Sequence, residues 1–387
     1  MTISELNTDS KQMLQETFKM KAKTYEGLED VLGRELMRMG AEDVDTDICT
    51  VTFSGDKFLL YQANYELRTA LKIYKEISRF EFNTSDEFYA QFKEYRWSKI
   101  LNIYKSFRVE VTGTSEVITV GNVKADITKI ICDYFNEKSH KMPPHDNSNP
   151  SVVIVIEVDN SRCSFLLDAS GTSLAHRGYK VSGGGFPYDE VYAAGLVQLT
   201  GWKANTNFIV PHCGAGTLLI EATMLAYNIP AQICRESFGF FSWRDFDESL
   251  WTEVKNSARL AVKHNGEFAY KLLGYETDET LVKAASQNIK KAMLDKYIEV
   301  QMESATDAEA PEGDTTVMVI APKINPFNVE ETRAKVDTLS KLAKRTYKNA
   351  KVWIHTDFGE MPKAIGIQPR KENEIKYNAE ENKLALY

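Results

Sequence analysis

Short alternating runs and amphipathic runs follow one another in the first part of the chain. The elements that they predict are a strand over 18–24, a helix over 25–39, a strand region over 44–53, a helix over 57–64 and an extended return over 67–80. This order predicts a ferredoxin-like split α/β unit over residues 18–81, preceded by a flexible leader over residues 1–17.

A second α+β unit is predicted over residues 82–169. Its elements are a helix over 85–95, a strand over 106–112, a long amphipathic helix over 120–138, and paired strands over 151–158 and 163–168. The next stretch is rich in Gly and Ser and ends in Gly183-Gly184-Gly185. Such a composition is typical of a connection between domains, so we expect a linker over residues 170–188.

Helical and strand patterns alternate from residue 189 to residue 387. Helices are predicted over 189–200, 217–227, 279–293 and 329–347, and strands over 207–210, 272–276, 298–302, 316–321, 351–356, 374–377 and 383–387. This alternation predicts a doubly wound, Rossmann-like α/β domain. The fold class expected for the whole chain is therefore α/β.

Composition excludes several classes of protein. Of the 387 residues, 43% are hydrophobic and 26% are charged, as in ordinary globular domains, and no apolar run is long enough to span a membrane. A cytoplasmic location is expected, with the five cysteines reduced. The histidines show no paired metal-ligand spacing, so no metal site is predicted. Because the net charge is -8, any nucleic-acid role requires a local basic patch.

A Gly-rich turn between a strand and a helix is the first candidate for chemistry. The strand ending at Val210 is followed by Cys213-Gly214-Ala215-Gly216-Thr217 and then by the helical pattern. Such a turn suits a nucleotide-like ligand, because the helix offers unpaired N–H groups at its start. Glu276 ends the next strand, where a carboxylate can accept a ribose hydroxyl, although residues 230–270 must then be an insertion. A plain tight turn and a solvated carboxylate remain open as alternatives.

Several ordered motifs together resemble one family. They are Ser170-Gly171-Thr172-Ser173-Leu174-Ala175-His176-Arg177-Gly178-Tyr179, Ala193-Ala194-Gly195, Cys213-Gly214-Ala215-Gly216-Thr217 and Gly274-Tyr275-Glu276. The chain resembles the THUMP-domain RNA methyltransferases, close to the bacterial large-subunit ribosomal RNA guanine-N2 methyltransferases that are often labelled adenine-specific DNA methylases. The resemblance implies that residues 82–169 form a THUMP domain and that residues 189–387 form a class I methyltransferase domain. It also implies S-adenosylmethionine as cofactor, bound by Cys213, Gly214, Gly216, Thr217 and Glu276, and structured, ribosomal RNA as partner.

Two positions depart from the family's cofactor pattern. The motif usually begins with Asp, which would hold the ammonium end of the methyl donor, but Val210 stands there. The acidic residue expected after the strand ending near Met302 aligns with Ser304, so the adenine amino group loses its usual partner unless Asp307 substitutes. Both departures predict weakened binding of the cofactor.

The catalytic motif departs further. An Asn-Pro-Pro-Tyr motif orients an exocyclic amine through the Asn side chain and a backbone carbonyl, while its aromatic ring stacks on the flipped base. At that place this chain reads Ala321-Pro322-Lys323-Ile324, which lacks the acceptor and the ring. Asn325, Pro326 and Phe327 form the alternative catalytic motif, four residues further along.

The RNA-binding side also differs from the family. Glu116 and Asn122 stand where basic residues are usual in the segment leading to the long helix, and Lys124 matches. The basic residues expected to contact RNA phosphates are Lys124, Arg162, Arg177 and Lys180. Ordinary solubilising side chains are the alternative for each.

Three functions therefore stay open. The first is an RNA-binding member of the family with an eroded site and little methyl transfer of its own, acting alone or in a homo- or hetero-oligomer with a methyltransferase. The second is an active S-adenosylmethionine-dependent enzyme that methylates guanine-N2 or adenine-N6 through Asn325-Pro326-Phe327. The third, a protein-binding adaptor, is the minor alternative.

Overall fold

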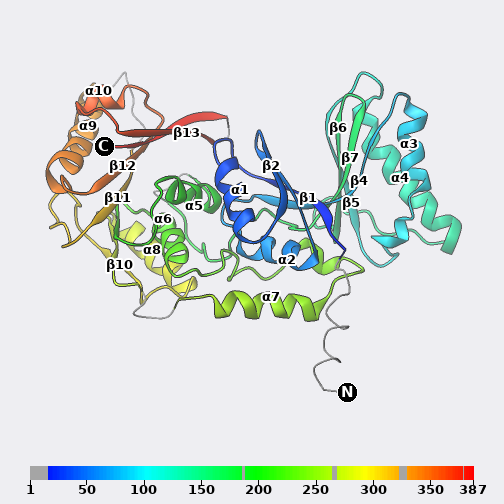
Figure 1. Cartoon of the computed structure of the whole chain (residues 1–387), viewed down its shortest axis with the longest axis horizontal. Helices are drawn as coiled ribbons and strands as arrows, with labels where there is room; N and C mark the ends of the chain where they lie inside the picture. The colour runs from blue at the N-terminus through cyan, green and yellow to red at the C-terminus, as the bar shows by residue number, and fades with distance from the viewer. Residues whose placement is uncertain (1–15, 185–187, 264–267, 322–328, 378) are drawn as a thin grey trace, which may run out of the picture.

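The computed structural model describes residues 16–184, 188–263, 268–321, 329–377 and 379–387. Most of the predicted leader lies outside these ranges. The described residues form two seven-stranded sheets, one in each half of an elongated molecule (Figure 1).

The first sheet has the strand order β2-β3-β1-β4-β7-β6-β5. Its strands are β1 (Phe18–Lys23), β2 (Glu42–Asp47), β3 (Thr50–Gly55), β4 (Lys72–Glu81), β5 (Phe107–Thr114), β6 (Val152–Asp159) and β7 (Arg162–Asp168). The helices of this half are α1 (Glu29–Arg38), α2 (Lys57–Glu66), α3 (Ser85–Glu94) and α4 (Val120–Ser139), with a short 3-10 turn η1 (Trp97–Lys99). The predicted strand region over 44–53 is a hairpin of two strands.

The ferredoxin-like unit and the second α+β unit share this one sheet. Strand β4 pairs with β7 in antiparallel register from Tyr74↔Asp168 to Glu81↔Arg162. A continuous apolar core runs beneath the helices of both units, from Leu36 on α1 to Ile127 on α4. Because the backbone hydrogen bonds of the sheet cross from one unit to the other, the two units form one structural body.

The second sheet has the order β10-β9-β8-β11-β12-β14-β13. Its strands are β8 (Asn207–Pro211), β9 (Leu272–Tyr275), β10 (Ile298–Gln301), β11 (Thr315–Ile320), β12 (Lys351–Thr356), β13 (Lys371–Tyr377) and β14 (Glu380–Leu386). Its half contains α5 (Glu190–Leu199), α6 (Thr217–Ala226), α7 (Glu248–Leu260), α8 (Glu279–Lys291), α9 (Val329–Lys341), α10 (Met361–Ile365), a 3-10 turn η2 (Gly239–Ser242) and a π turn η3 (Leu342–Thr346).

Five strands of this sheet, β8 to β12, run parallel, and β14 lies antiparallel between β12 and β13. The direction of the strand order reverses between β8 and β11, because β9 and β10 lie on one side of β8 and β11 and β12 lie on the other. Open α/β sheets bind ligands at such a point, at the carboxyl ends of their strands. The predicted Rossmann-like, class I methyltransferase fold is confirmed.

Part of the predicted insertion at residues 230–270, from η2 to α7, packs against the ferredoxin-like unit. Helix α7 contacts α2, and it runs beneath that unit in Figure 1. The ring of Phe240 is stacked on Tyr61 with 4.4 Å between centroids, and Trp251 belongs to the apolar core of the first half. Conversely, Leu28 on the ferredoxin side belongs to the core of the second half. The halves therefore exchange core residues.

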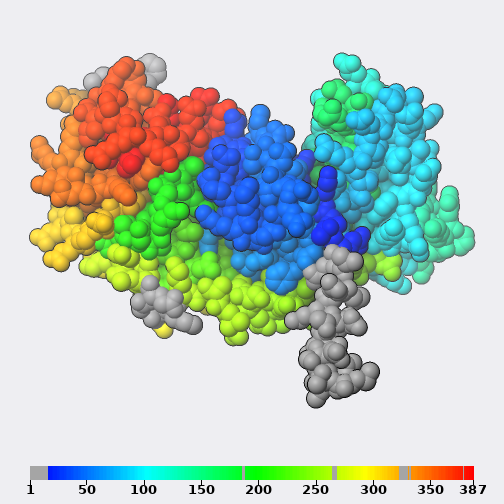
Figure 2. Space-filling view, in the orientation of Figure 1, coloured from blue at the N-terminus to red at the C-terminus, as the bar shows by residue number. Residues whose placement is uncertain are grey.

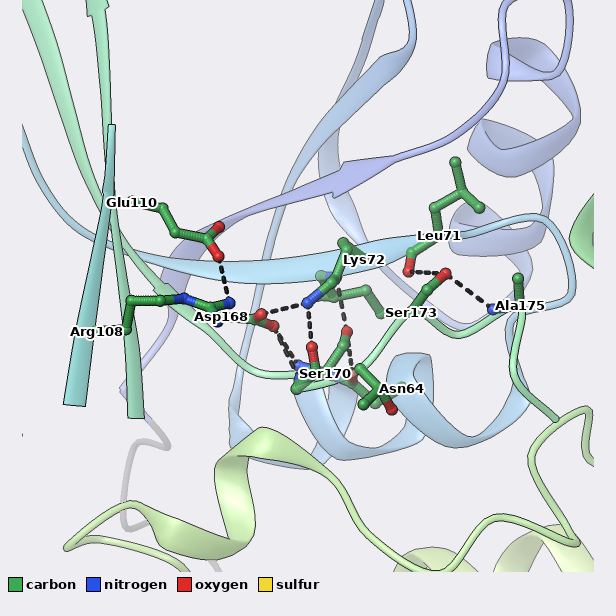
Figure 3. A network of polar contacts seen from close by, with 12 residues as sticks. Asn64, Leu71, Lys72, Arg108, Glu110, Asp168, Ser170, Ser173 and Ala175 are labelled. Carbon is green, nitrogen blue, oxygen red and sulfur yellow. Dashed lines mark hydrogen bonds and ion pairs between the residues drawn. The ribbon is translucent and has the colours of Figure 1, made fainter. Parts of the chain in front are cut away.

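The first residues after β7 are fastened to the ferredoxin-like unit (Figure 3). The carboxylate of Asp168 accepts the N–H groups of Ser170 (2.8 Å) and Gly171 (3.0 Å) and pairs with Lys72. The Ser170 hydroxyl donates to the Asn64 amide oxygen at 2.8 Å.

The following residues are bonded to the second half. Arg235 donates to the carbonyl oxygens of Ser170 and Thr172. The Asn288 amide oxygen accepts the N–H groups of Val181 (2.9 Å) and Ser182 (3.1 Å).

The linker predicted over residues 170–188 is therefore anchored over residues 170–184, whereas residues 185–187 lie outside the described part. Its Gly and Ser content indicated flexibility, but side chains distant in sequence satisfy several of its backbone polar groups. Composition alone does not reveal such partners.

Among the described residues, no helix is both long and apolar enough to cross a membrane. The same residues contain no group of three or more His, Cys, Asp or Glu side chains arranged to hold a metal ion.

Candidate functional site

The Gly-rich turn lies at the carboxyl end of β8, directly before α6. Its backbone enters the left-handed region at His212 (φ 59°), Gly214 (φ 54°) and Gly216 (φ 84°). A Cβ atom at Gly216 would lie 3.4 Å from the Cβ atom of Ala285, so α8 approaches the turn closely. The turn thus favours glycine at Gly214 and Gly216 for their dihedral angles, and a side chain larger than alanine at Gly216 would meet α8.

Glu276 meets this turn from the end of β9. The Glu276 carboxylate accepts the N–H group of Gly214 at 3.0 Å, and those of Thr277 and Asp278 at 2.9 and 3.2 Å. The side chain is buried, with 6% exposure. The alternative of a solvated strand-end carboxylate therefore does not describe Glu276, which lies beside the turn as predicted.

Cys213 packs in the core and is not a reactive thiol. Its side chain is buried in the core of the second half, and burial, with the nearby charge of Glu276, raises the pKa of Cys213 to about 12. The thiol therefore stays protonated at neutral pH and does not act as a nucleophile.

Unsatisfied polar groups accompany the start of α6. Gly216 is the N-cap residue and supplies no side-chain cap for the N–H groups of the first turn. The hydroxyl of Thr217 is buried without a hydrogen-bond partner among the described residues. An uncapped helix start, an orphaned hydroxyl and an adjacent carboxylate fit a ligand that carries hydroxyl groups and acceptor atoms. The residues present thus fit the ribose and carboxylate ends of S-adenosylmethionine.

Val210 is fully buried and belongs to the apolar core, so this position offers no polar atom to a ligand. The Ser304 hydroxyl lies 2.8 Å from that of Thr306. Asp307 is exposed and forms an ion pair with Lys341 at 2.9 Å, which lowers the pKa of its carboxyl. Its suggested contact with the adenine amino group stays a prediction.

The segment for which catalysis is predicted begins at Ala321, whose N–H group donates to the carbonyl of His355 at 2.9 Å. Pro322, Lys323 and Ile324 lie outside the described residues, as does the alternative motif Asn325-Pro326-Phe327. The catalytic assignment to either motif remains a prediction.

Three of the predicted RNA-binding residues lie on the surface. Lys124, Arg162 and Lys180 are exposed. The Lys124 ammonium approaches the Asn147 amide oxygen at 3.4 Å, and the Arg162 guanidinium lies 3.6 Å from the Glu81 carboxylate. These loose surface contacts leave the cations accessible to phosphate.

Arg177 requires a correction. Its side chain has 0% exposure, and its guanidinium lies 3.5 Å from the Glu221 carboxylate. It also donates to the carbonyl oxygens of Leu174 and Arg68. A guanidinium held in this way cannot reach an RNA phosphate, so Arg177 has a structural role.

An aromatic cluster at the carboxyl edge was not predicted. His355 lies near the end of β12, and its Nε2 atom is 3.0 Å from the Tyr192 hydroxyl. Tyr188 is stacked on Tyr192 with 4.6 Å between centroids. Tyr377 and Tyr25 complete the cluster. The residues come from four distant segments, so no local motif could have revealed the cluster.

Comparison with protein families divides the chain in the same order as the structure. Residues 19–74 match the RlmL ferredoxin-like domain, residues 82–168 the THUMP domain, and residues 177–351 the RMKL-like methyltransferase domain.

Two curated relatives are both named ribosomal RNA large subunit methyltransferase K/L. The protein from Desulfotalea psychrophila is 31% identical over 293 residues, and that from Photobacterium profundum is 29% identical over 302 residues. The aligned regions cover 74% and 77% of this chain but 40% and 42% of those proteins, so the chain spans less than half of their length.

Two solved structures have the same fold over nearly the whole chain. SMU.472, solved in complex with SAH, superposes with a TM-score of 0.85 at 22% identity, covering 97% of this chain and 98% of its own. TrmN from Thermus thermophilus has a TM-score of 0.67 at 14% identity, covering 96% of this chain and 99% of its own. The three matched domains and their shared architecture place the chain in the family of THUMP-domain proteins that join an RlmL ferredoxin-like domain to an RMKL-like methyltransferase domain.

Proposed function

We propose that this chain binds structured ribosomal RNA and S-adenosylmethionine, and that its own methyl transfer is slow. The contact between Glu276 and Gly214 at the start of α6 carries the cofactor part of this proposal. SMU.472 binds SAH in a chain of the same fold, and the curated relatives are named as ribosomal RNA methyltransferases.

The cofactor supplies the methyl group, and the protein supplies its orientation. Oε1 of the Glu276 carboxylate accepts two backbone N–H groups, whereas Oε2 accepts one and retains a lone pair that can take a ribose hydroxyl as well. The uncapped N–H groups at the start of α6 and the Thr217 hydroxyl are available to the polar end of the ligand. Val210 leaves the ammonium end without a carboxylate, which predicts weak affinity.

Slow transfer follows from the residues at the end of β11. A target amine needs an acceptor that orients its protons and a ring that stacks on the base, and Ala321 provides neither. Positioning and charge stabilisation are each worth several kcal/mol in a transition state, so their loss reduces the rate strongly. An oligomeric partner with an intact motif would supply the missing chemistry.

Calorimetric titration with S-adenosylmethionine, paired with transfer of tritiated methyl groups to large-subunit ribosomal RNA, tests the proposal. We expect weak cofactor binding and slow transfer. Val210→Asp should tighten the binding, and its combination with Ala321→Asn, Lys323→Pro and Ile324→Tyr should raise the rate.

Enzyme-like turnover by the unmodified chain, abolished by Asn325→Ala, would instead assign catalysis to the alternative motif. No binding of RNA by the unmodified chain would refute the RNA part of the proposal.

A further inference from the structure

A basic cavity lies between the ferredoxin-like unit and the methyltransferase domain. It has a volume of about 580 Å³. Its lining residues come from helix α1, from the turn after α5, from Lys263 after α7 and from strand β13. In Figures 1 and 2, α1, α5 and β13 meet on the face that is toward the viewer.

Positive charge dominates the lining. The five cations are Arg34, Arg38, Lys203, Lys263 and Lys371, and the two carboxylates are Asp30 and Glu374. The excess of three positive charges contrasts with the net charge of -8 for the whole chain.

The cations of the cavity lack counterions among the residues that the structure describes. Within the described ranges, no carboxylate lies within ion-pair distance of any of the five, whereas Glu374 lies 4.0 Å from the Lys383 ammonium. Lys371 lies over the ring of Trp353 at 5.9 Å from its centroid. Their charge is therefore available to an external anion.

Two buried side-chain amide donors also indicate an anionic ligand. Gln198 and Asn373 line the cavity, and the side-chain amide nitrogens of both are buried without a hydrogen-bond partner among the described residues. A buried amide donor without an acceptor is costly. Cations and unmatched donors together select a ligand that carries negatively charged acceptor oxygens.

The cavity is remote from the cofactor site. Lys203 lies just before β8. Lys371 is paired with Leu386 on β14, and Leu386 is paired in turn with Trp353 near the start of β12. These positions mark the amino ends of the parallel strands, whereas Gly214 and Glu276 lie at their carboxyl ends. Binding in the cavity is therefore separate from binding of the cofactor.

We propose that this inter-domain cavity binds the phosphodiester backbone of the structured RNA, an inference that rests on the RNA binding proposed above. Four of the five cations, all except Lys263, are exposed. Exposed cations around a cavity suit the successive phosphates of a polymer, whereas a small ligand is usually enclosed by its polar contacts. The site spans two domains, so it fixes the RNA against both.

Salt-dependent binding of large-subunit ribosomal RNA to the full chain tests this inference. Each phosphate contact contributes roughly 0.7 to 0.9 to the slope of log affinity against log salt concentration. Arg34→Glu combined with Arg38→Glu should lower the affinity at least ~10-fold and flatten the slope by about 2. Binding of S-adenosylmethionine should not change.

Lys290→Glu with Lys291→Glu is the matched control, because it makes the same charge change at two exposed positions on α8. An equal loss of affinity in this control, or unchanged affinity and slope in the α1 variant, would overturn the inference. Titrations with inorganic phosphate and with ATP form the other arm. Tight binding of either at the cavity, with RNA affinity insensitive to the α1 variant, would assign the cavity to a free phosphate compound.

The two proposals fail differently. RNA binding that survives every cavity substitution refutes the cavity inference alone. An unmodified chain that binds no RNA refutes both.

Discussion

The guanidinium of Arg177 lies 3.5 Å from the carboxylate of Glu221, and neither side chain is exposed to solvent. Arg177 follows the first sheet in the chain, and Glu221 lies on α6 of the second half. Arg177 also donates to the carbonyl oxygen of Arg68 at 2.6 Å, and Tyr179 donates to Glu221 at 2.9 Å. A buried ionic network therefore joins the half that contains the first sheet to the helix that begins at the Gly-rich turn.

Arg177→Met should destabilise the protein by about 3 to 5 kcal/mol, because it leaves the Glu221 carboxylate buried without its cation. Arg177→Met with Glu221→Gln should recover about 2 kcal/mol, since the remaining group is neutral and still accepts from Tyr179. Urea unfolding at pH 7 measures both differences. Equal destabilisation by the single and double variants would show that lost packing, not the unpaired charge, is the cause.

The sequence predicts local structure well and long-range contacts poorly. Periodicity located the helices and strands because alternation is a local property of the chain. It also placed Glu276 at the end of the strand after the Gly-rich turn, whereas its contact with Gly214 is known only from the structure. Arg177 looked like a surface cation because its partner lies far away in sequence. The insertion at residues 230–270 gave no signal that its aromatic residues complete another domain's core.

The shared core predicts that the first half does not fold alone. A fragment of residues 16–184 should populate a partly folded state that binds a hydrophobic dye, because it lacks the apolar cover supplied by Phe240 and Trp251. In the full chain, Trp251→Ala should cost about 3 to 5 kcal/mol. Thermal unfolding and limited proteolysis measure these effects. A cooperatively unfolding fragment, or efficient cleavage of the native chain within residues 170–184, would contradict the shared-core interpretation.

Gly216→Val should abolish binding of S-adenosylmethionine, because the new side chain meets Ala285 and must adopt a φ of 84°. Gly40→Val is the matched control, since Gly40 has a φ of 88° with no atom within 4 Å of a Cβ placed there. Calorimetric titration of both variants separates backbone strain from loss of the site. Comparable loss of binding in the control would mean that general destabilisation explains the result.

His355 should make the protein sensitive to acid. Burial lowers the pKa of His355 to about 3, so the folded state keeps it neutral while the unfolded state takes up a proton below pH ~6.5. Through this group alone, the free energy of unfolding should therefore fall by about 1.4 kcal/mol for each pH unit as the pH is lowered from 6.5 to 3. His355→Gln retains a partner for Tyr192 and should remove this component. Unfolding free energies of both proteins at pH 7.5 and 4.5 test the difference, and parallel pH curves would count against it.

Glu190 should have the opposite pH dependence in the neutral range. Its side chain is 6% exposed, and burial raises the pKa of Glu190 to about 7. The folded state therefore retains a proton that the unfolded state loses above pH ~4.5, so stability falls as the pH rises from 4.5 to 7. Glu190→Gln should abolish this fall. The change that it causes in the free energy of unfolding should be about 3 kcal/mol more favourable at pH 8 than at pH 4.5. Glu248→Gln is the matched control, because Glu248 also follows an Asp N-cap but is exposed, and it should leave the pH profile unchanged. If both variants follow the unmodified protein across this range, the Glu190 carboxylate is solvated in the folded chain and the assigned burial is wrong.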